Sequence, residues 1–201
     1  MLRPDLSNNK PNLEPRPKTS HNSRYHVMRH SPPKTIPTLL ESQRTILRPF
    51  QLQDADAAHR WFSDPLAMRF TPTGPDTNIE GTRARLVKYI AHQTERGFSK
   101  WIVLDRASLE PIGDSGILWL EEFHSFELGY RLRSDYWGKG FATEIAKTWV
   151  ASAPAFGLSE IGAFAHIENV PSHAVLRKAG FAQIRQATVM GMDSLVFHLS
   201  F

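Results

Sequence analysis

The chain of 201 residues has no cysteine, which excludes disulfide bonds, thiolate metal sites and a cysteine nucleophile. It also lacks any apolar run close to the roughly 18–20 residues that span a bilayer, so we expect no membrane partner. Neither the P-loop pattern Gly-x-x-x-x-Gly-Lys-Ser/Thr nor the dinucleotide fingerprint Gly-x-Gly-x-x-Gly occurs. The six histidines after residue 40 show no metal-ligand spacing with nearby carboxylates, so we expect no metal site.

Basic residues and prolines are concentrated at the start of the chain. Residues 1–40 contain seven of the 24 Lys/Arg residues, two of the 20 Asp/Glu residues and seven of the 14 prolines. Such a composition buries too little apolar surface to offset the entropy of ordering, so we expect a disordered, basic, proline-rich tail. An alternative is that Met28 is the native start and the preceding residues are an artefact. The segment has no continuous apolar stretch of the secretory type, and we expect a cytoplasmic protein.

Residues 41–201 are expected to form one α/β domain, with 17 basic and 18 acidic side chains that nearly balance. This balance gives no indication of a nucleic-acid surface. Periodicity and turn residues predict helices from Asp54 to about residue 62 and at 79–96, 141–153 and 171–179. Strands are predicted at 45–50, 99–105, 112–121, 126–133, 160–166, 181–189 and 194–201.

The most informative segment is the turn that carries Gly138 and Gly140, between a predicted strand and the helix that follows it. Glycines at a helix entry leave several backbone N–H groups pointing the same way, at the positive end of the helix dipole. Such a place binds phosphate or pyrophosphate well. A tight strand-to-helix connection without a ligand is an equally good interpretation of an isolated Gly-x-Gly turn.

Three ordered blocks make residues 40–201 resemble the GNAT superfamily of acyl-CoA-dependent N-acyltransferases. The blocks are Trp137-Gly-Lys-Gly-Phe-Ala142, Asn169-x-x-Ser172 with Gly180-Phe181, and the pair Thr45-Ile-Leu-Arg-Pro-Phe50 and Glu127-Leu-Gly-Tyr-Arg-Leu132. Within the superfamily, the last pair looks like the Rim-type ribosomal-protein N-terminal acetyltransferases. The resemblance implies a GNAT-like mixed, mostly antiparallel, splayed sheet flanked by helices, in an N-acetyltransferase domain at 41–201.

The resemblance also implies a reaction, which is transfer of acetyl from acetyl-CoA to a primary amine by direct attack. The expected acceptor is a protein N-terminal α-amine, and a small-molecule amine such as an antibiotic or polyamine is the second candidate. Two hypotheses from other classes are a coenzyme A-binding module without turnover and nucleic-acid binding through the tail. We expect a monomer or homodimer.

The resemblance further implies which residues bind the cosubstrate. Backbone N–H groups of the glycine turn bind the pyrophosphate, and the strand backbone near its end pairs with the pantetheine arm. An asparagine at the start of the last helix hydrogen-bonds the arm, although a generic turn asparagine would need no ligand. The predicted set is Leu132, Arg133, Trp137, Gly138, Lys139, Gly140, Phe141, Ala142, Thr143 and Asn169.

Glu127 is the candidate general base, because an alkylammonium with a pKa near ~10 must lose a proton before it attacks a thioester. Strand alternation places Arg131 on the same face, so a strand ion pair is the alternative. Ser172 is the candidate acid for the departing thiolate, because Leu176 occupies the position at which many family members carry a tyrosine. A local backbone hydrogen bond at the helix start is the alternative for Ser172.

If the tail packs on nothing, a chain shortened to begin at Met28, or near Thr38, keeps the melting temperature and turnover of the full chain within experimental error. Thermal unfolding and thiol-release assays on the full and shortened chains check this expectation. A large loss of either quantity would mean that the tail packs on the domain or shapes the acceptor site.

Overall fold

The computed structural model describes residues 37–121 and 124–201, so most of the predicted tail lies outside the described residues. One boundary of that prediction is corrected. Leu40, the last residue assigned to the tail, is buried and pairs with Leu47 of the neighbouring strand. The folded domain therefore begins slightly earlier than the change in composition indicates.

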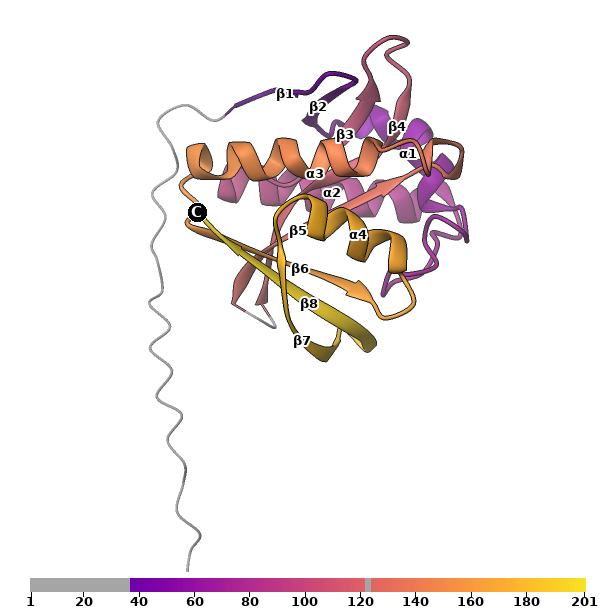
Figure 1. Ribbon diagram of the computed structural model, residues 1–201. Helices are drawn as coiled ribbons and strands as arrows, with labels where there is room; N and C mark the ends of the chain where they lie inside the picture. Colours follow the sequence, from indigo (N-terminus) through magenta and orange to yellow (C-terminus); the bar gives the residue numbers. More distant parts are fainter. Residues whose placement is uncertain (1–36, 122–123) are drawn as a thin grey trace, which may run out of the picture.

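The domain is built on one sheet of eight strands in the order β1-β2-β3-β4-β5-β6-β8-β7 (Figure 1). All neighbouring strands are antiparallel except β5 and β6, which run parallel. This mixed, mostly antiparallel sheet confirms the predicted fold class. The strands are β1 (Leu40–Glu41), β2 (Thr45–Pro49), β3 (Lys100–Asp105), β4 (Pro111–Leu120), β5 (Ser125–Leu132), β6 (Glu160–His166), β7 (Ala182–Val189) and β8 (Met192–Ser200).

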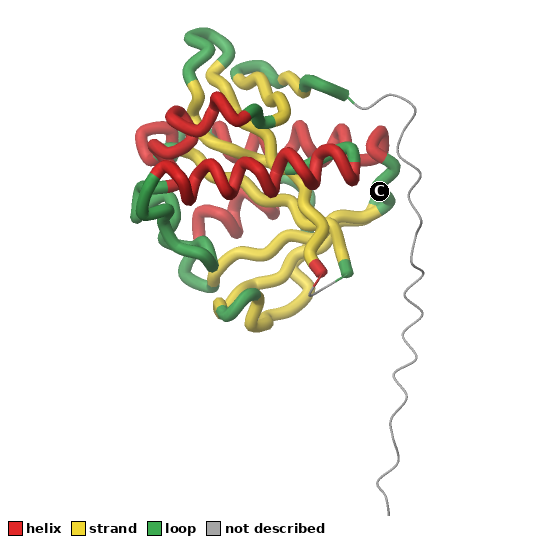
Figure 2. The backbone as a smooth tube through the Cα atoms, turned by 180° about the vertical axis from the view of Figure 1, so that it is seen from behind, coloured by secondary structure: helices red, strands yellow, loops and turns green. Residues whose placement is uncertain are grey.

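Helices cover both faces of the sheet, as the front and rear views show (Figures 1 and 2). The helices are α1 (Ala55–Phe62), α2 (Ile79–Arg96), α3 (Phe141–Ser152) and α4 (Val170–Lys178). On one face, Trp61 of α1 and Leu86 of α2 pack with Ile102 of β3 in a buried cluster. On the other face, Trp149 of α3 and Leu176 of α4 belong to a larger cluster with Trp101, the neighbour of Ile102. Because successive side chains of β3 point to opposite faces of the sheet, this strand contributes to both buried clusters.

Local sequence signals explain where the longest helix begins and ends. The Asn78 side chain accepts a hydrogen bond from the backbone N–H of Gly81, and so caps the start of α2. Gly97 ends the helix in a left-handed conformation (φ 84°), which costs glycine little. Within the described part of the chain, no helix is both long and apolar enough to cross a membrane.

The sheet opens between β5 and β6. These strands pair at one position, Glu127 with Gly162, whereas β4 pairs with β5 along the whole stretch 125–132. The Arg133 N–H donates to the carbonyl of Ile112, at the base of β4. Backbone groups alternate between the two sides of a strand, so the N–H and C=O of Tyr130 face the opening between β5 and β6. The edge of β5 beyond Glu127 is therefore not paired with β6.

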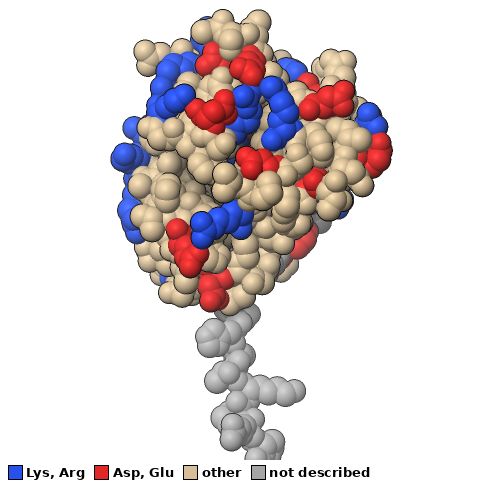
Figure 3. Space-filling model, turned by 90° about the vertical axis from the view of Figure 1, so that its right-hand side faces the viewer, with Lys and Arg blue, Asp and Glu red and all other residues tan. Residues whose placement is uncertain are grey.

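Ionic side chains are interspersed on the surface of the domain. Figure 3 shows Lys and Arg side chains next to Asp and Glu side chains across one face. Exposed ion pairs of the domain include Arg69 with Glu168 (3.3 Å) and Arg83 with Glu80 (2.6 Å). Such pairs contribute little to stability, typically ~0–1 kcal/mol.

Gly116 of β4 is required for close packing of β3 and β4. A Cβ atom at this position would lie 2.0 Å from the backbone carbonyl oxygen of Ser99. Gly116→Ala should therefore lower the free energy of unfolding by about 1–3 kcal/mol or more, as overpacking does elsewhere. The matched control is Gly81→Ala in the first turn of α2, where the added Cβ has ordinary contacts of 3.5 Å and longer.

Urea unfolding of both variants checks this expectation. Gly81→Ala should leave stability unchanged or raise it, because alanine is favoured in a helix by roughly 0.5–1 kcal/mol. Equal stability of the two alanine variants would show that β3 and β4 are not packed as closely as described.

Candidate functional site

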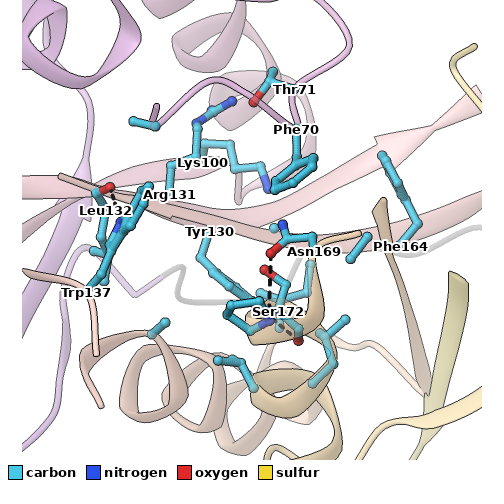
Figure 4. Close-up of a pocket in the computed structure, with 18 of the residues that line it drawn as sticks. Phe70, Thr71, Lys100, Tyr130, Arg131, Leu132, Trp137, Phe164, Asn169 and Ser172 are labelled. Atoms are coloured by element: carbon cyan, nitrogen blue, oxygen red, sulfur yellow. Dashed lines mark hydrogen bonds between the residues drawn. The ribbon is translucent and has the colours of Figure 1, made fainter. Parts of the chain in front are cut away.

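A cavity of about 610 Å³ lies where β5 and β6 separate, which is a size typical of small-molecule sites. Its lining comes from strands β3 to β6, from α2 and α4, from the start of α3 with the turn before it, and from the loop between α1 and α2 (Figure 4). Of the predicted site residues, the cavity brings together Glu127, Leu132, Trp137, Gly138, Gly140, Phe141, Ala142, Thr143, Asn169 and Ser172. Arg133 and Lys139 are not among the lining residues.

The glycine turn has the backbone conformation that an anion site needs. Gly138 (φ 71°) and Gly140 (φ 83°) are both left-handed, a region that other residues enter only with strain. The chain enters α3 directly after Gly140, and the first N–H groups of a helix have no partner within the helix. Phe141 and Thr143 of this first turn line the cavity. The turn can therefore present backbone N–H groups to a phosphate.

Arg44 supports this turn, and the sequence analysis missed it. Its Nη1 donates to the Lys139 carbonyl (2.9 Å), its Nε donates to Glu144 (2.7 Å), and its guanidinium lies 4.3 Å from the Phe141 ring centroid. Burial tends to raise the pKa of Glu144, but hydrogen bonds from Ser42 and Arg44 hold it below its ordinary value. The cation of Arg44 thus compensates a carboxylate that stands in the first turn of α3, directly after the glycine turn.

The backbone of Arg133, at the end of β5, is predicted to pair with the pantetheine arm, but its groups are engaged within the protein. Its N–H donates to Ile112, its carbonyl accepts from Tyr136 (3.0 Å), and its side chain bonds Glu110 and Asp135. Both backbone groups are therefore already used, because the strand alternation directs the Arg133 N–H toward β4. Arg133 therefore has no free backbone group for the pantetheine arm.

Trp137 has a role that the sequence did not predict. Its indole Nε1 donates to the Leu132 carbonyl (2.8 Å), which joins the glycine turn to the end of β5 (Figure 4). Lys139 lies outside the cavity with its ammonium 5.5 Å from the Tyr136 ring centroid. The backbone of Lys139 belongs to the turn, but its side chain is directed elsewhere.

The start of α4 forms another wall of the cavity (Figure 4). The Asn169 Oδ1 caps the helix by accepting from the Ser172 N–H (3.3 Å), which is the structural role considered for this residue. The Tyr130 hydroxyl donates to the Ser172 carbonyl (3.2 Å), and burial raises the pKa of Tyr130. Among the described residues, the Ser172 hydroxyl has no hydrogen-bond partner, so the predicted alternative of a local backbone bond is not formed. Leu176 is buried and brings no polar group.

Glu127 lies at the vertex of the opening, in the one residue pair that joins β5 to β6. The alternative prediction, an ion pair with Arg131, is wrong. Four residues of extended strand separate the two Cα atoms by roughly 13 Å, whereas Asp114 stands directly opposite Arg131 on β4. Arg131 accordingly donates to Asp114 through Nε (3.0 Å) and Nη2 (2.8 Å).

The partner of Glu127 is Lys100 of β3, whose Nζ lies 3.7 Å from Oε2 of Glu127 and donates to the Gly116 carbonyl (3.0 Å). Burial lowers the pKa of Lys100, and the nearby carboxylates Glu127 and Asp114 oppose this effect. Gly129 makes room for the ammonium, because a Cβ there would lie 2.2 Å from Nζ. The glycine in the middle of β5 therefore marks the approach of a lysine.

The histidines near the cavity have structural roles. His92 Nδ1 lies 2.7 Å from the Phe98 carbonyl oxygen, and its Nε2 accepts from the Trp119 N–H (3.1 Å). The His173 ring lies 3.0 Å from the carbonyl oxygen of His166. Within residues 37–121 and 124–201, no three His, Asp or Glu side chains are grouped as metal ligands.

Comparisons of the sequence with known proteins give consistent matches. The family model described as acetyltransferase (GNAT) domain matches residues 44–182. The uncharacterized N-acetyltransferase YoaA of Bacillus subtilis (strain 168) is 32% identical over 145 residues, which are 71% of this chain and 82% of that protein. The uncharacterized N-acetyltransferase p20 of Bacillus licheniformis is 27% identical over 144 residues, covering 71% and 81%.

Solved structures share the fold. An acetyltransferase from Agrobacterium tumefaciens str. C58 superposes with a TM-score of 0.72 at 24% identity, covering 86% of this chain and 99% of that one. The ribosomal-protein-S5-alanine acetyltransferase from Vibrio fischeri gives 0.66 at 22% identity, covering 82% and 97%. The microcin C7 self-immunity acetyltransferase MccE, in complex with acetyl-CoA and AMP, gives 0.67 at 12% identity, covering 79% and 93%.

Proposed function

Since the chain belongs to the GNAT acetyltransferase family, it is an acetyl-CoA-dependent acyltransferase, and we propose that it acetylates a primary amine bound beside Glu127. The observation that carries this proposal is the cavity itself. One continuous space joins the unpaired edge of β5, the glycine turn at the start of α3 and the Glu127 carboxylate.

The residues of the cavity fit acetyl-CoA. The N–H groups of Gly138 to Thr143 bind the pyrophosphate, and the left-handed glycines leave the backbone accessible there. The free N–H and C=O of Tyr130 hydrogen-bond the amide groups of the pantetheine arm, as an added strand would. Apolar side chains, among them Leu132, Phe141 and Val175, also line the cavity.

Glu127 accepts the proton that the amine must lose before it can attack. Acetyl-CoA supplies the activated carbonyl, and the amine displaces coenzyme A directly, without a covalent bond to the enzyme. The Glu127 side chain is 15% exposed, so it is accessible from the cavity although Lys100 holds it. A backbone N–H where β5 and β6 separate donates to the carbonyl oxygen as negative charge develops. The Ser172 hydroxyl donates to the departing thiolate.

The acceptor that we propose first is the α-amine of a protein N-terminus, as in the Rim-type enzymes. This assignment is supported by the Glu127–Leu132 block and by fold likeness to the ribosomal-protein-S5-alanine acetyltransferase. A small-molecule amine is the second candidate, supported by the fold likeness to MccE, which was solved with AMP. A panel of N-terminal peptides and small amines, followed by thiol release and product mass, separates the two.

The first prediction concerns the glycine turn. Gly140→Val should abolish measurable acetyl-CoA binding in calorimetry, because a branched side chain obstructs the approach of the pyrophosphate to the backbone. Valine at a positive φ also strains the chain by roughly 1–3 kcal/mol. The matched control is Gly157→Val, which has the same strain (φ 78°) but lies outside the cavity lining. Unchanged binding in a folded Gly140→Val protein would remove the turn from the site.

The second prediction concerns the base. Glu127→Gln should lower turnover by about 10²-fold or more, and the defect should shrink as the pH approaches the pKa of the acceptor amine, where free amine forms unaided. Acetyl-CoA affinity should hardly change, since Glu127 is at the other end of the cavity from the turn. The control is Glu95→Gln on the exposed face of α2. A loss of turnover that is uniform at every pH, with a lower melting temperature, would show that Glu127 has a structural role.

A further inference from the structure

The half of the cavity that faces α2 has a cationic wall. Among the described residues, Arg85, Lys100 and Arg131 line this side, and Glu127 is the one carboxylate that lines it. Lys100 is already engaged with Glu127 and with the Gly116 carbonyl. Arg85 and Arg131 differ from Lys100 in one respect. Their carboxylate partners, Asp76 and Asp114, are not part of the cavity lining, whereas Glu127 is.

Two of the three guanidinium nitrogens of Arg85 are held by hydrogen bonds. Its Nε and Nη2 donate to the two carboxylate oxygens of Asp76 (3.2 and 2.5 Å), and Nη2 also donates to the Thr73 hydroxyl (3.2 Å). Nη1 makes no hydrogen bond to any described residue. The Arg85 side chain is 14% exposed, and Arg85 is one of the residues that line the cavity.

Arg131 repeats this arrangement on β5. Nε and Nη2 donate to Asp114, Nη2 also donates to the Tyr89 hydroxyl (3.0 Å), and Nη1 has no partner among the described residues. The Cζ atoms of Arg85 and Arg131 both lie 4.8 Å from the centroid of the Phe62 ring. Both guanidinium groups therefore pack against the same aromatic ring.

Stability does not explain why these two ion pairs lie at the cavity. A buried ion pair is often no more stabilising than well-packed apolar residues of the same volume. A guanidinium held by an aspartate is, however, well prepared to bind a second anion, because its remaining N–H groups already have a fixed direction. A second ammonium group of an acceptor would meet repulsion from the same wall.

We propose that Nη1 of Arg85 and Nη1 of Arg131 bind a carboxylate of the acceptor, so that the acceptor is a primary amine with a carboxylate on the same molecule. This proposal rests on the proposed acetyl transfer and names the acceptor class. Glu127 and Arg131 lie four residues apart on the same face of β5. An acidic side chain near a peptide N-terminus and the carboxylate of a free amino acid share this chemistry.

Matched acceptors test the proposal on the unmodified enzyme. The peptide Ser-Glu-Ala-Ala with an amidated C-terminus is compared with Ser-Gln-Ala-Ala, and serine is compared with serinamide. We expect the carboxylate member of one pair to exceed its neutral isostere in kcat/KM by about tenfold or more, and this preference to fall with added salt. The pair that shows the preference identifies the source, and 1,4-diaminobutane should be a poor acceptor.

Arg85→Gln should bring the ratio of kcat/KM values for the acidic and neutral acceptors close to one. Arg83→Gln, an exposed position on the same helix that pairs with Glu80, should leave the ratio unchanged. Arg85→Lys keeps a charge beside Asp76 if the glutamine variant does not fold, and it should reduce the ratio because it lacks the fork. A ratio near one in the unmodified enzyme, or one that Arg85→Gln does not change, overturns the proposal. Acetylation of no amine at all contradicts the proposed function as well.

Discussion

The structure depends on where β5 and β6 stop pairing. They share the pair Glu127–Gly162 and then diverge, while β4 continues along β5 to its end. This single junction leaves strand backbone unpaired beside the start of α3, and it puts a carboxylate at the vertex of the resulting cavity. An antiparallel partner along the whole of β5 would use the same backbone groups and fill the same space. The cavity proposed for the cosubstrate is therefore a consequence of interrupted pairing.

The second constraint is charge in a partly buried space. Arg131 and Arg85 have short bidentate contacts with Asp114 and Asp76, whereas Lys100 lies 3.7 Å from Glu127. The pKa values follow this difference. Burial disfavours the charge of each cation, yet the pKa of Arg131 is raised by Asp114, whereas the pKa of Lys100 is lowered. The Glu127 carboxylate thus has a longer contact with its cation than the two aspartates have, which suits the proton acceptor proposed above.

Long periodic segments and glycine turns were predictable because their signals are local. The helix at 79–96 and the turn at Gly138 and Gly140 both occur where the sequence indicates. Contacts between distant segments were not predictable. Arg44 hydrogen-bonds Glu144, which lies 100 residues further along the chain. The Lys100 ammonium of β3 lies beside Gly129 of β5, where it contacts Glu127. Strand alternation identified the face shared by Glu127 and Arg131 but not the distance between them, so their predicted pairing failed.

The central claim is that acetyl-CoA lies in the opening between β5 and β6, with its arm along the free edge of β5. Amide hydrogen exchange with and without acetyl-CoA tests this claim most directly, since backbone hydrogen bonds to the cosubstrate slow exchange. The account predicts slower exchange at Tyr130 and Leu132 and at the turn from Gly138 to Thr143. Protection confined to other segments, with these amides unchanged, would contradict it.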